Sequence, residues 1–229
     1  MSSSLEEFQQ RLGHSFADEN LLRQALTHAS FGHEKRQRTP DNQRLEFLGD
    51  AVLQLAVTAE LYRRFPELPE GEMTVLRARL VNRHHLQALA QELGLGDQLI
   101  LGRGEENSQG RQRGSILADA MEAVIGAVFA EAGWDAARAI ILRLLEPSLA
   151  GLTGEGDAAT ANPKGHLQEK LQAEGEAPPV YRCTSETGPA HARVYEVTVE
   201  WQGRELGRGQ GASKKEAETR AAQAALDAL

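Results

Sequence analysis

The fold of this chain is decided by the segment Asn42-Gln43-Arg44-Leu45-Glu46-Phe47-Leu48-Gly49-Asp50-Ala51-Val52-Leu53. From Leu45 to Ala59 nearly every residue is apolar, and at about 100° per residue these side chains surround a helix on all sides. We therefore expect this helix to be buried all round. Glu46 and Asp50 are four residues apart, so they lie on one face of it. A positive group must lie against that face, because an unpaired buried carboxylate is costly.

A second segment, residues 116–130, repeats the pattern. It is apolar except for Asp119 and Glu122, whose spacing of three residues again puts both on one face. Two buried helices that each carry a carboxylate pair can build a cage of oxygen ligands in a helical core. No Cys or His lies at ligand spacing nearby, so the cage suits Mg²⁺ or Mn²⁺ better than Zn²⁺.

A structural alternative is open for both pairs. Neighbouring arginines would neutralise the carboxylates as buried ion pairs, and the candidates are Arg44, Arg77 and Arg79. Because a buried ion pair is often replaceable by apolar residues without loss of stability, two matching pairs favour a functional site.

The composition is that of a globular protein. The chain has 229 residues, 41% hydrophobic and 25% charged, which allows one large or two small domains. We expect no secretory signal and no membrane span, because no apolar run approaches the ~18 residues that a span needs. The single Cys183 cannot form an intrachain disulfide, which fits a reducing cytoplasm.

The net charge of −8 argues against nucleic acid as a partner, but the acidity is unevenly distributed. Up to Asn162 the chain has 16 Lys and Arg against 23 Asp and Glu, and beyond it 9 against 10. The excess lies where the carboxylate cage is predicted, and bound cations would offset part of it.

The flexible composition of residues 151–163 predicts the one domain boundary. Everything before it is predicted to be helical, including a single long amphipathic helix from about residue 70 to residue 93. Residues 31–41 are expected to be a loop, and so is the Gly-rich segment 102–114. The arginines of that Gly-rich loop would hold an RNA phosphate or would simply be solvated. His28 is expected to be a buried, hydrogen-bonded structural histidine.

Beyond the boundary the periodicity changes. A helix is expected over residues 164–173, then strands over 180–185, 194–201 and 206–211 with a turn at Gln202-Gly203, then a helix over 213–229. In the segment Gly207–Lys215, glycines would let the backbone approach a phosphate, and Lys214 and Lys215 stand at a helix start that attracts anions.

These motifs carry a resemblance. Residues 42–53 resemble the signature of the ribonuclease III family of double-stranded-RNA endonucleases, and residues 115–123 resemble its second catalytic segment. The α-β-β-β-α order of the last part resembles the double-stranded-RNA-binding domain. The resemblance implies an all-α endonuclease domain at 1–150, a flexible linker at 151–161 and a small α+β double-stranded-RNA-binding domain at 162–229.

The resemblance also implies roles for single residues. Asp50 and Glu122 would be catalytic, and the metal ligands would be Glu46, Asp50, Asp119 and Glu122, with Glu70 as candidate ligand of a second ion. Phe47 would contact the partner subunit of a homodimer. The RNA-binding residues would be Gln168, Glu169, Gln172, His191, Lys214 and Lys215.

The resemblance implies a cytoplasmic enzyme that uses Mg²⁺, with Mn²⁺ able to substitute. The resemblance also implies that it cuts ribosomal precursor and other structured transcripts to 5′-phosphate and 3′-hydroxyl ends with short 3′ overhangs. Two positions depart from the family pattern. Gln43 replaces the first acidic residue of the signature, so dimer contacts or metal affinity would be altered. Glu218 stands where many of these domains have a third basic residue, so RNA affinity would be modest and steeply salt-dependent.

Two other functions are weighed against the endonuclease. In a non-catalytic RNA-binding protein the carboxylates would be structural, but such a protein has no reason to keep all four. A phosphohydrolase of small nucleotides would leave the C-terminal module without a task. Stabilisation by Mg²⁺ that is lost in Glu122→Gln would separate a metal site from structural carboxylates.

Overall fold

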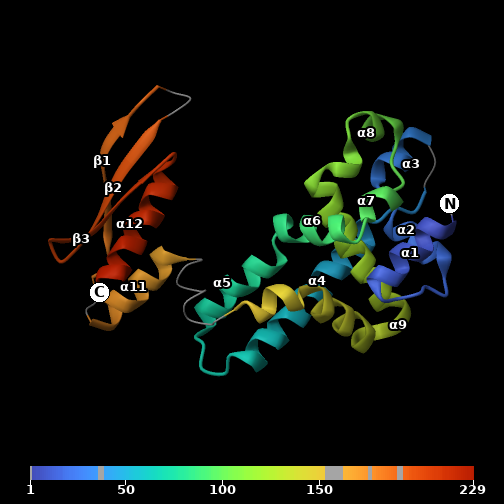
Figure 1. The fold of residues 1–229 in the computed structure, drawn as a ribbon, viewed down its shortest axis with the longest axis horizontal. Coiled ribbons are helices and arrows are strands. Elements are labelled where there is room, and N and C mark those ends of the chain that lie inside the picture. The colour runs from blue at the N-terminus through green and yellow to red at the C-terminus, as the bar shows by residue number, and fades with distance from the viewer. Residues whose placement is uncertain (1, 36–38, 153–161, 175–176, 190–192) are drawn as a thin grey trace. The chain divides into compact units, whose positions relative to one another are not determined.

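The computed structural model describes the whole chain except residues 1, 36–38, 153–161, 175–176 and 190–192. The chain divides into two compact units (Figure 1). We call Met1–Glu67 with Arg77–Leu152 the helical unit, and Leu68–Leu76 with Thr153–Leu229 the mixed unit. The predicted linker at 151–161 lies almost entirely outside the described residues. No helix among the described residues is long and apolar enough to cross a membrane.

The helical unit is built from helices joined by short connections. They are α1 (Ser2–Leu12), α2 (Glu19–Ala25), α3 (Ala29–Lys35), α4 (Gln43–Arg64), α6 (Arg83–Glu92), α7 (Leu95–Gln98), α8 (Arg103–Asn107), the 3-10 helix η1 (Gly110–Gln112) and α9 (Gly114–Ala150). Helix α5 (Glu70–Val81) runs from the mixed unit into the helical unit.

The core of the helical unit forms where α4 packs along α9 (Figure 1). Both helices contribute fully apolar faces, with Leu53, Ala56 and Val57 of α4 and Met121 and Val124 of α9 at most 1% exposed. Helix α9 changes direction inside its 37 residues at Gly133, where φ is 78° and ψ is −171°. Only a residue without a Cβ adopts that backbone conformation readily.

The prediction that α4 is buried on all sides is wrong. Phe47 is 82% exposed, Leu55 57% and Tyr62 71%, and together they form an apolar stripe along one face of the helix. Apolar side chains at helical spacing predict an apolar helix face. They do not predict whether the same chain or another chain covers that face.

Glu60 near the end of α4 is a buried carboxylate held by three arginines. Its oxygens accept from Arg63 Nη2 at 2.6 Å, Arg64 Nε at 2.7 Å and Arg138 Nη2 at 3.2 Å. Hydrogen bonds from Arg63 and Arg64 lower the pKa of Glu60 to about 2, so it is ionised at neutral pH. Because Arg138 belongs to α9, the cluster ties the end of α4 to the far half of α9.

Three local predictions are corrected. The long helix from 70 to 93 is interrupted at Asn82, whose side-chain oxygen accepts from the backbone N–H of His85 at 2.9 Å and so caps a new helix, α6. The loop predicted at 31–41 begins as helix α3. The Gly-rich loop contains α8 and η1, and Arg111 and Arg113 pair with Glu106 and Glu105 at 2.7 and 2.8 Å. These two guanidinium groups are thus engaged within the loop.

The mixed unit contains the elements that the sequence predicts, in the order α11 (Pro163–Glu174), β1 (Val180–Thr187), β2 (Val194–Trp201), β3 (Arg204–Gly211) and α12 (Lys214–Ala228). The described strands form an antiparallel sheet in the order β1-β2-β3. Both helices cover one face of it (Figure 1), where Leu167 and Leu171 of α11 meet Val197 and Val199 of β2. The turn at Gln202-Gly203 has positive φ at both residues, as a type I′ hairpin turn requires.

The glycines of β3 face helix α12. A Cβ on Gly209 would lie 2.3 Å from the backbone nitrogen of Ala221, and a Cβ on Gly207 would lie 2.5 Å from the carbonyl oxygen of the same residue. Ala217 and Ala221 on the helix are completely buried. The glycines therefore serve close packing of a helix on a sheet, in place of the approach to phosphate that the sequence suggested.

Candidate active site and RNA-binding surface

Three carboxylates gather on the helical unit. Glu46 projects from α4, and Asp119 and Glu122 project from the first half of α9. One oxygen of each lies within 4.8 Å of those of the other two, and all three residues are half-buried. Within the described residues this is the one group of acidic or histidine side chains compact enough to hold a metal ion. The structure thus brings together three of the four core ligands that the resemblance implied.

Asp50, the fourth, lies close to the cluster but at its exposed edge. Its carboxylate accepts a hydrogen bond from Gln54 Nε2 at 3.4 Å, and its charge raises the pKa of both Glu46 and Glu122. Glu70 begins α5, where its carboxylate accepts from the Thr74 hydroxyl at 3.0 Å. Its assignment to a second ion stays a prediction.

The carboxylates of the cluster are partly removed from water and repel one another. Burial, followed by the charges of Asp50, Glu46 and Asp119, raises the pKa of Glu122 to about 7. Burial is also the first cause that raises the pKa of Glu46 and of Asp119. A hard divalent cation would relieve this repulsion, and the all-oxygen donor set is the one that such an ion prefers.

The positive charge beside the cluster comes from a residue that no sequence pattern singles out. Arg83 lowers the pKa of Asp119 and of Glu122, against the effect of burial. Of the arginines that the structural alternative proposed, Arg44 is exposed and Arg77 donates to the Thr58 hydroxyl at 3.1 Å. Arg83 is the first residue of α6, directly after its N-cap Asn82. Recognition of Asn82 as a capping residue would have predicted a new helix that begins at Arg83.

His28 is hydrogen bonded, as expected for a structural histidine, but it is half-buried where the sequence predicted a buried side chain. Its Nδ1 lies 2.9 Å from the hydroxyl oxygen of Ser30, which in turn accepts from the backbone N–H of Gly102. The charge of His28 also lowers the pKa of Asp119. His28 thus joins the start of α3 to the segment before α8, and it borders the cluster without being part of it.

The raised pKa of Glu122 predicts that a divalent cation held by the cluster would bind more tightly as pH rises. Between about 4.5 and about 7 the folded protein holds a proton that the unfolded chain releases, so the stability of the metal-free protein falls as pH rises through this window. A divalent cation would bind the ionised form and restore that stability. We expect saturating MgCl₂ to raise the melting temperature more at about pH 8 than at about pH 5, by calorimetry. Equal increases at both pH values would contradict this.

The predicted RNA-binding residues lie on the surface of the mixed unit. Gln168, Glu169 and Gln172 are exposed on α11, whereas Leu167 and Leu171 of the same helix are buried. Lys214 and Lys215 are exposed at the start of α12. His191 lies outside the described residues.

Side chains around α12 fix how that helix begins. The hydroxyl of Ser213 accepts from the backbone N–H of Glu216 at 3.2 Å, and the carboxylate of Glu216 accepts from the backbone N–H of Ala212 at 2.8 Å. These are the bonds of a helix N-cap. Lys214 lies over the ring of Tyr195, with Nζ 5.9 Å from its centre. The lysine pair therefore projects from a well-defined helix terminus.

Glu218, the departure from the family pattern, is engaged with another cation. Its carboxylate lies 2.6 Å from Lys164 Nζ, which itself lies 4.5 Å from the centre of the Tyr181 ring. The acidic residue thus holds Lys164 of α11 against β1.

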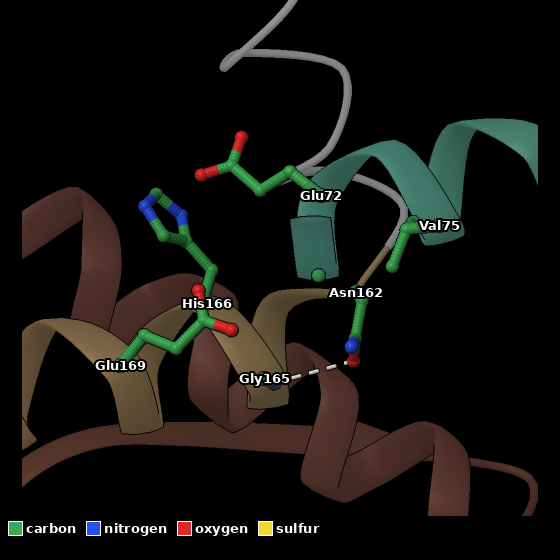
Figure 2. Close-up of a pocket in the computed structure, with 7 residues that line it drawn as sticks. Glu72, Val75, Asn162, Gly165, His166 and Glu169 are labelled. Carbon is green, nitrogen blue, oxygen red and sulfur yellow. Dashed lines mark hydrogen bonds between the residues drawn. The ribbon is translucent and has the colours of Figure 1, made fainter. Parts of the chain in front are cut away.

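A small pocket of about 80 Å³ also belongs to the mixed unit (Figure 2). Its lining includes Glu72, His166 and Glu169, and Asn162, whose side-chain oxygen accepts from the backbone N–H of Gly165 at 3.2 Å. The acidic and histidine side chains here are not among the described groups compact enough to hold a metal ion. The pocket adds nothing to the catalytic site.

A helical unit with a half-buried carboxylate cluster, followed by an α-β-β-β-α module with exposed lysines, defines the class of nucleases that act on structured RNA. Comparison with known families agrees. The family described as "Ribonuclease-III-like" matches residues 18–149, and the "Double-stranded RNA binding motif" matches residues 163–229. The chain belongs to the ribonuclease III family and is an endoribonuclease that acts on double-stranded RNA.

Similar proteins cover nearly the whole chain. Ribonuclease 3 of Desulfotalea psychrophila is 46% identical over 96% of this chain and 90% of its own length. Ribonuclease 3 of Symbiobacterium thermophilum is 47% identical over 94% of this chain and 90% of its own. Among solved structures, the nuclease domain of ribonuclease III from Campylobacter jejuni superimposes with a TM-score of 0.60 at 44% identity, and covers 65% of this chain and 97% of that one.

Proposed function

We propose that this endoribonuclease requires a divalent cation, normally Mg²⁺ with Mn²⁺ able to substitute, and leaves 5′-phosphate and 3′-hydroxyl ends with short 3′ overhangs. The observation that carries the proposal is the gathering of Glu46, Asp119 and Glu122 within 4.8 Å of one another. Its cellular substrates would be ribosomal precursor and other structured transcripts in the cytoplasm.

Each carboxylate has a role in this proposal. Glu46, Asp119 and Glu122 hold the cation, and Asp50 completes the site from its exposed edge. When bound, a divalent cation activates water for attack and neutralises charge on the phosphate. Glu122, whose pKa is raised to about 7, would release its proton to solvent when a cation binds. The charge of Arg83 beside the cluster favours approach of the RNA backbone. Glu70 remains the candidate ligand of a second ion.

Binding of duplex RNA is assigned to the exposed faces of the mixed unit. Gln168, Glu169 and Gln172 form one contact region on α11, and Lys214 and Lys215 form another at the start of α12. His191 would supply a third. Such regions contact two successive minor grooves and the phosphates between them over about 16 base pairs, so they read the shape of the helix and its 2′-hydroxyls.

The proposed reaction is tested with the native chain and a long duplex RNA of mixed sequence. Cleavage is followed in MgCl₂, in MnCl₂ and in excess EDTA, and product ends are identified by labelling with polynucleotide kinase before and after phosphatase treatment. We expect cleavage with either metal, none in EDTA, and 5′ ends that accept label only after phosphatase. Cleavage that continues in EDTA, or 5′ ends that are labelled directly, would show the proposal to be wrong.

We also propose that the chain forms a homodimer through α4. Phe47 is 82% exposed and lies beside a hollow of about 630 Å³ that is lined by Gln24, Gln43, Arg44, Leu45 and Leu48. An exposed aromatic ring next to a hollow on the same surface can pair with its own copy about a two-fold axis, each ring entering the hollow of the other. Gln43, the departure in the signature, lines that hollow. A solved structure of the Campylobacter jejuni nuclease domain is described as flexible in a region involved in dimer formation.

Removal of this ring should weaken the dimer. We expect Phe47→Ala to raise the dimer dissociation constant by about 100-fold or more, because a central aromatic anchor carries a large share of interface energy. Sedimentation equilibrium over a range of protein concentrations measures this constant. The control is Val180→Ala, which removes an exposed apolar side chain of the mixed unit. An unchanged dimer in Phe47→Ala would exclude this face as the interface.

A further inference from the structure

The two helices that carry the carboxylates touch each other through glycines. A Cβ on Gly49 of α4 would lie 1.8 Å from the carbonyl oxygen of Glu122 and 2.9 Å from the backbone nitrogen of Gly126. A Cβ on Gly126 of α9 would lie 2.1 Å from the carbonyl oxygen of Leu45 and 3.0 Å from the backbone nitrogen of Gly49. The atoms in the way are backbone, so no rotation of a side chain relieves the clash.

The contact points coincide with the proposed metal ligands. Gly49 precedes Asp50, and the carbonyl that a Cβ would meet belongs to Glu122 itself. On the opposite side Gly126 approaches Leu45, the residue before Glu46. A change in the distance between the helices at this crossing therefore also changes the distances between the carboxylates, because no flexible segment lies between the contact and these residues.

Glycine is needed at this crossing, but not along the whole length of the two helices. Elsewhere on these helices alanine is accommodated: Ala56, Ala120, Ala123 and Ala127 are all completely buried with their Cβ atoms in place. Glycine is a poorer helix former than alanine, so two facing glycines in helix interiors weaken both helices. Gly49 and Gly126 differ from the other interface residues in lying beside the carboxylates, and this position explains why glycine stands there.

We infer that Gly49 and Gly126 are positioning residues for the metal site, and that they set the separation of the carboxylates to the size of a small cation. This rests on the proposed metal dependence. An added Cβ would separate the helices by about 1 Å or more, since non-bonded carbon contacts lie near 3.5–4.0 Å. Ligand distances at Mg²⁺ are about 2.0–2.1 Å and vary little, whereas Ca²⁺ accepts about 2.3–2.6 Å and irregular geometry.

The test is binding of Mg²⁺ alone and Ca²⁺ alone to the full chain without RNA, by isothermal titration calorimetry. In Gly49→Ala and in Gly126→Ala we expect the dissociation constant for Mg²⁺ to rise by about 10-fold or more, with a smaller rise for Ca²⁺. The ratio of the two constants is the decisive quantity, because partial unfolding would affect both ions equally. If Gly49→Ala does not fold, Gly126→Ala provides the same test from the facing helix.

A matched control separates positioning from stability. Leu61→Ala creates a cavity in α4 about 18 Å along the helix from Gly49, and should lower the melting temperature without changing the ratio. If the glycine variants keep the native ratio, the inference is overturned. If the native chain binds neither ion, the proposed metal dependence is what fails, and the two failures are thereby distinguished.

Discussion

The Glu122→Gln variant is expected to bind double-stranded RNA like the native chain but to cut it slower by a factor on the order of 10³ or more, the scale seen when one member of a catalytic group is removed. Gln keeps the shape of the side chain but has no negative charge to offer a cation. Because Glu122 is half-buried among other carboxylates, removal of its charge should also stabilise the metal-free protein at neutral pH. Loss of cleavage would then not be a consequence of unfolding.

Single-turnover cleavage and a gel-shift binding assay in Ca²⁺ measure the two activities separately. The matched control is Glu146→Gln on the same helix, where the carboxylate is 53% exposed and pairs with Arg64 at 2.7 Å. We expect this control to cut at the native rate. A Glu122→Gln variant that also cuts at the native rate would show that the carboxylate cluster is structural.

The second large effect is expected from Gly209→Val in β3, which should unfold the mixed unit and lower RNA affinity by about 100-fold or more. Even a Cβ at this position would lie 2.3 Å from the backbone of α12, and valine adds two further methyl groups. Overpacking in a core costs about 1–3 kcal/mol when side chains can adjust, and more when the obstacle is a helix backbone. A small domain has only about 5 kcal/mol to lose.

Calorimetry and gel-shift binding together check this expectation. The transition of the mixed unit should disappear while that of the helical unit remains. Gln210→Val is the control, because the side chain of Gln210 is exposed on the same strand and its backbone carbonyl still accepts from Arg220 at 2.7 Å. Native affinity in Gly209→Val would show that α12 does not depend on this contact.

The sequence predicted both secondary-structure patterns and the carboxylate pairs, because periodicity and spacing along one helix are local properties. It did not predict what lies opposite a given face. The stripe at Phe47, Leu55 and Tyr62 has the same apolar composition as the core, yet it is exposed. The glycines of β3 were expected to allow approach of a phosphate, whereas they face α12. A glycine indicates that some group comes close to the backbone, but it does not indicate which group.

An unrecognised helix end accounts for a further error. Asn82 lies inside an apparently continuous amphipathic pattern, and its capping bond to the backbone of His85 divides that pattern into two helices. The break brings Arg83 to the start of α6, from where its charge acts on the cluster. A group that approaches from another helix has no spacing signal relative to the carboxylates, so only the tertiary structure reveals it.

The contact between α4 and α9 also bears on the order of events during synthesis. Glu46 leaves the ribosome long before Asp119 and Glu122, so the carboxylate cluster cannot form until nearly the entire helical unit has emerged. Until then the apolar faces of α4 lack α9, the helix on which they pack, and exposed apolar surface of this kind makes an intermediate prone to aggregate. A chain released before α9 is made would lack Asp119 and Glu122, whereas the mixed unit draws most of its core from the last stretch of sequence.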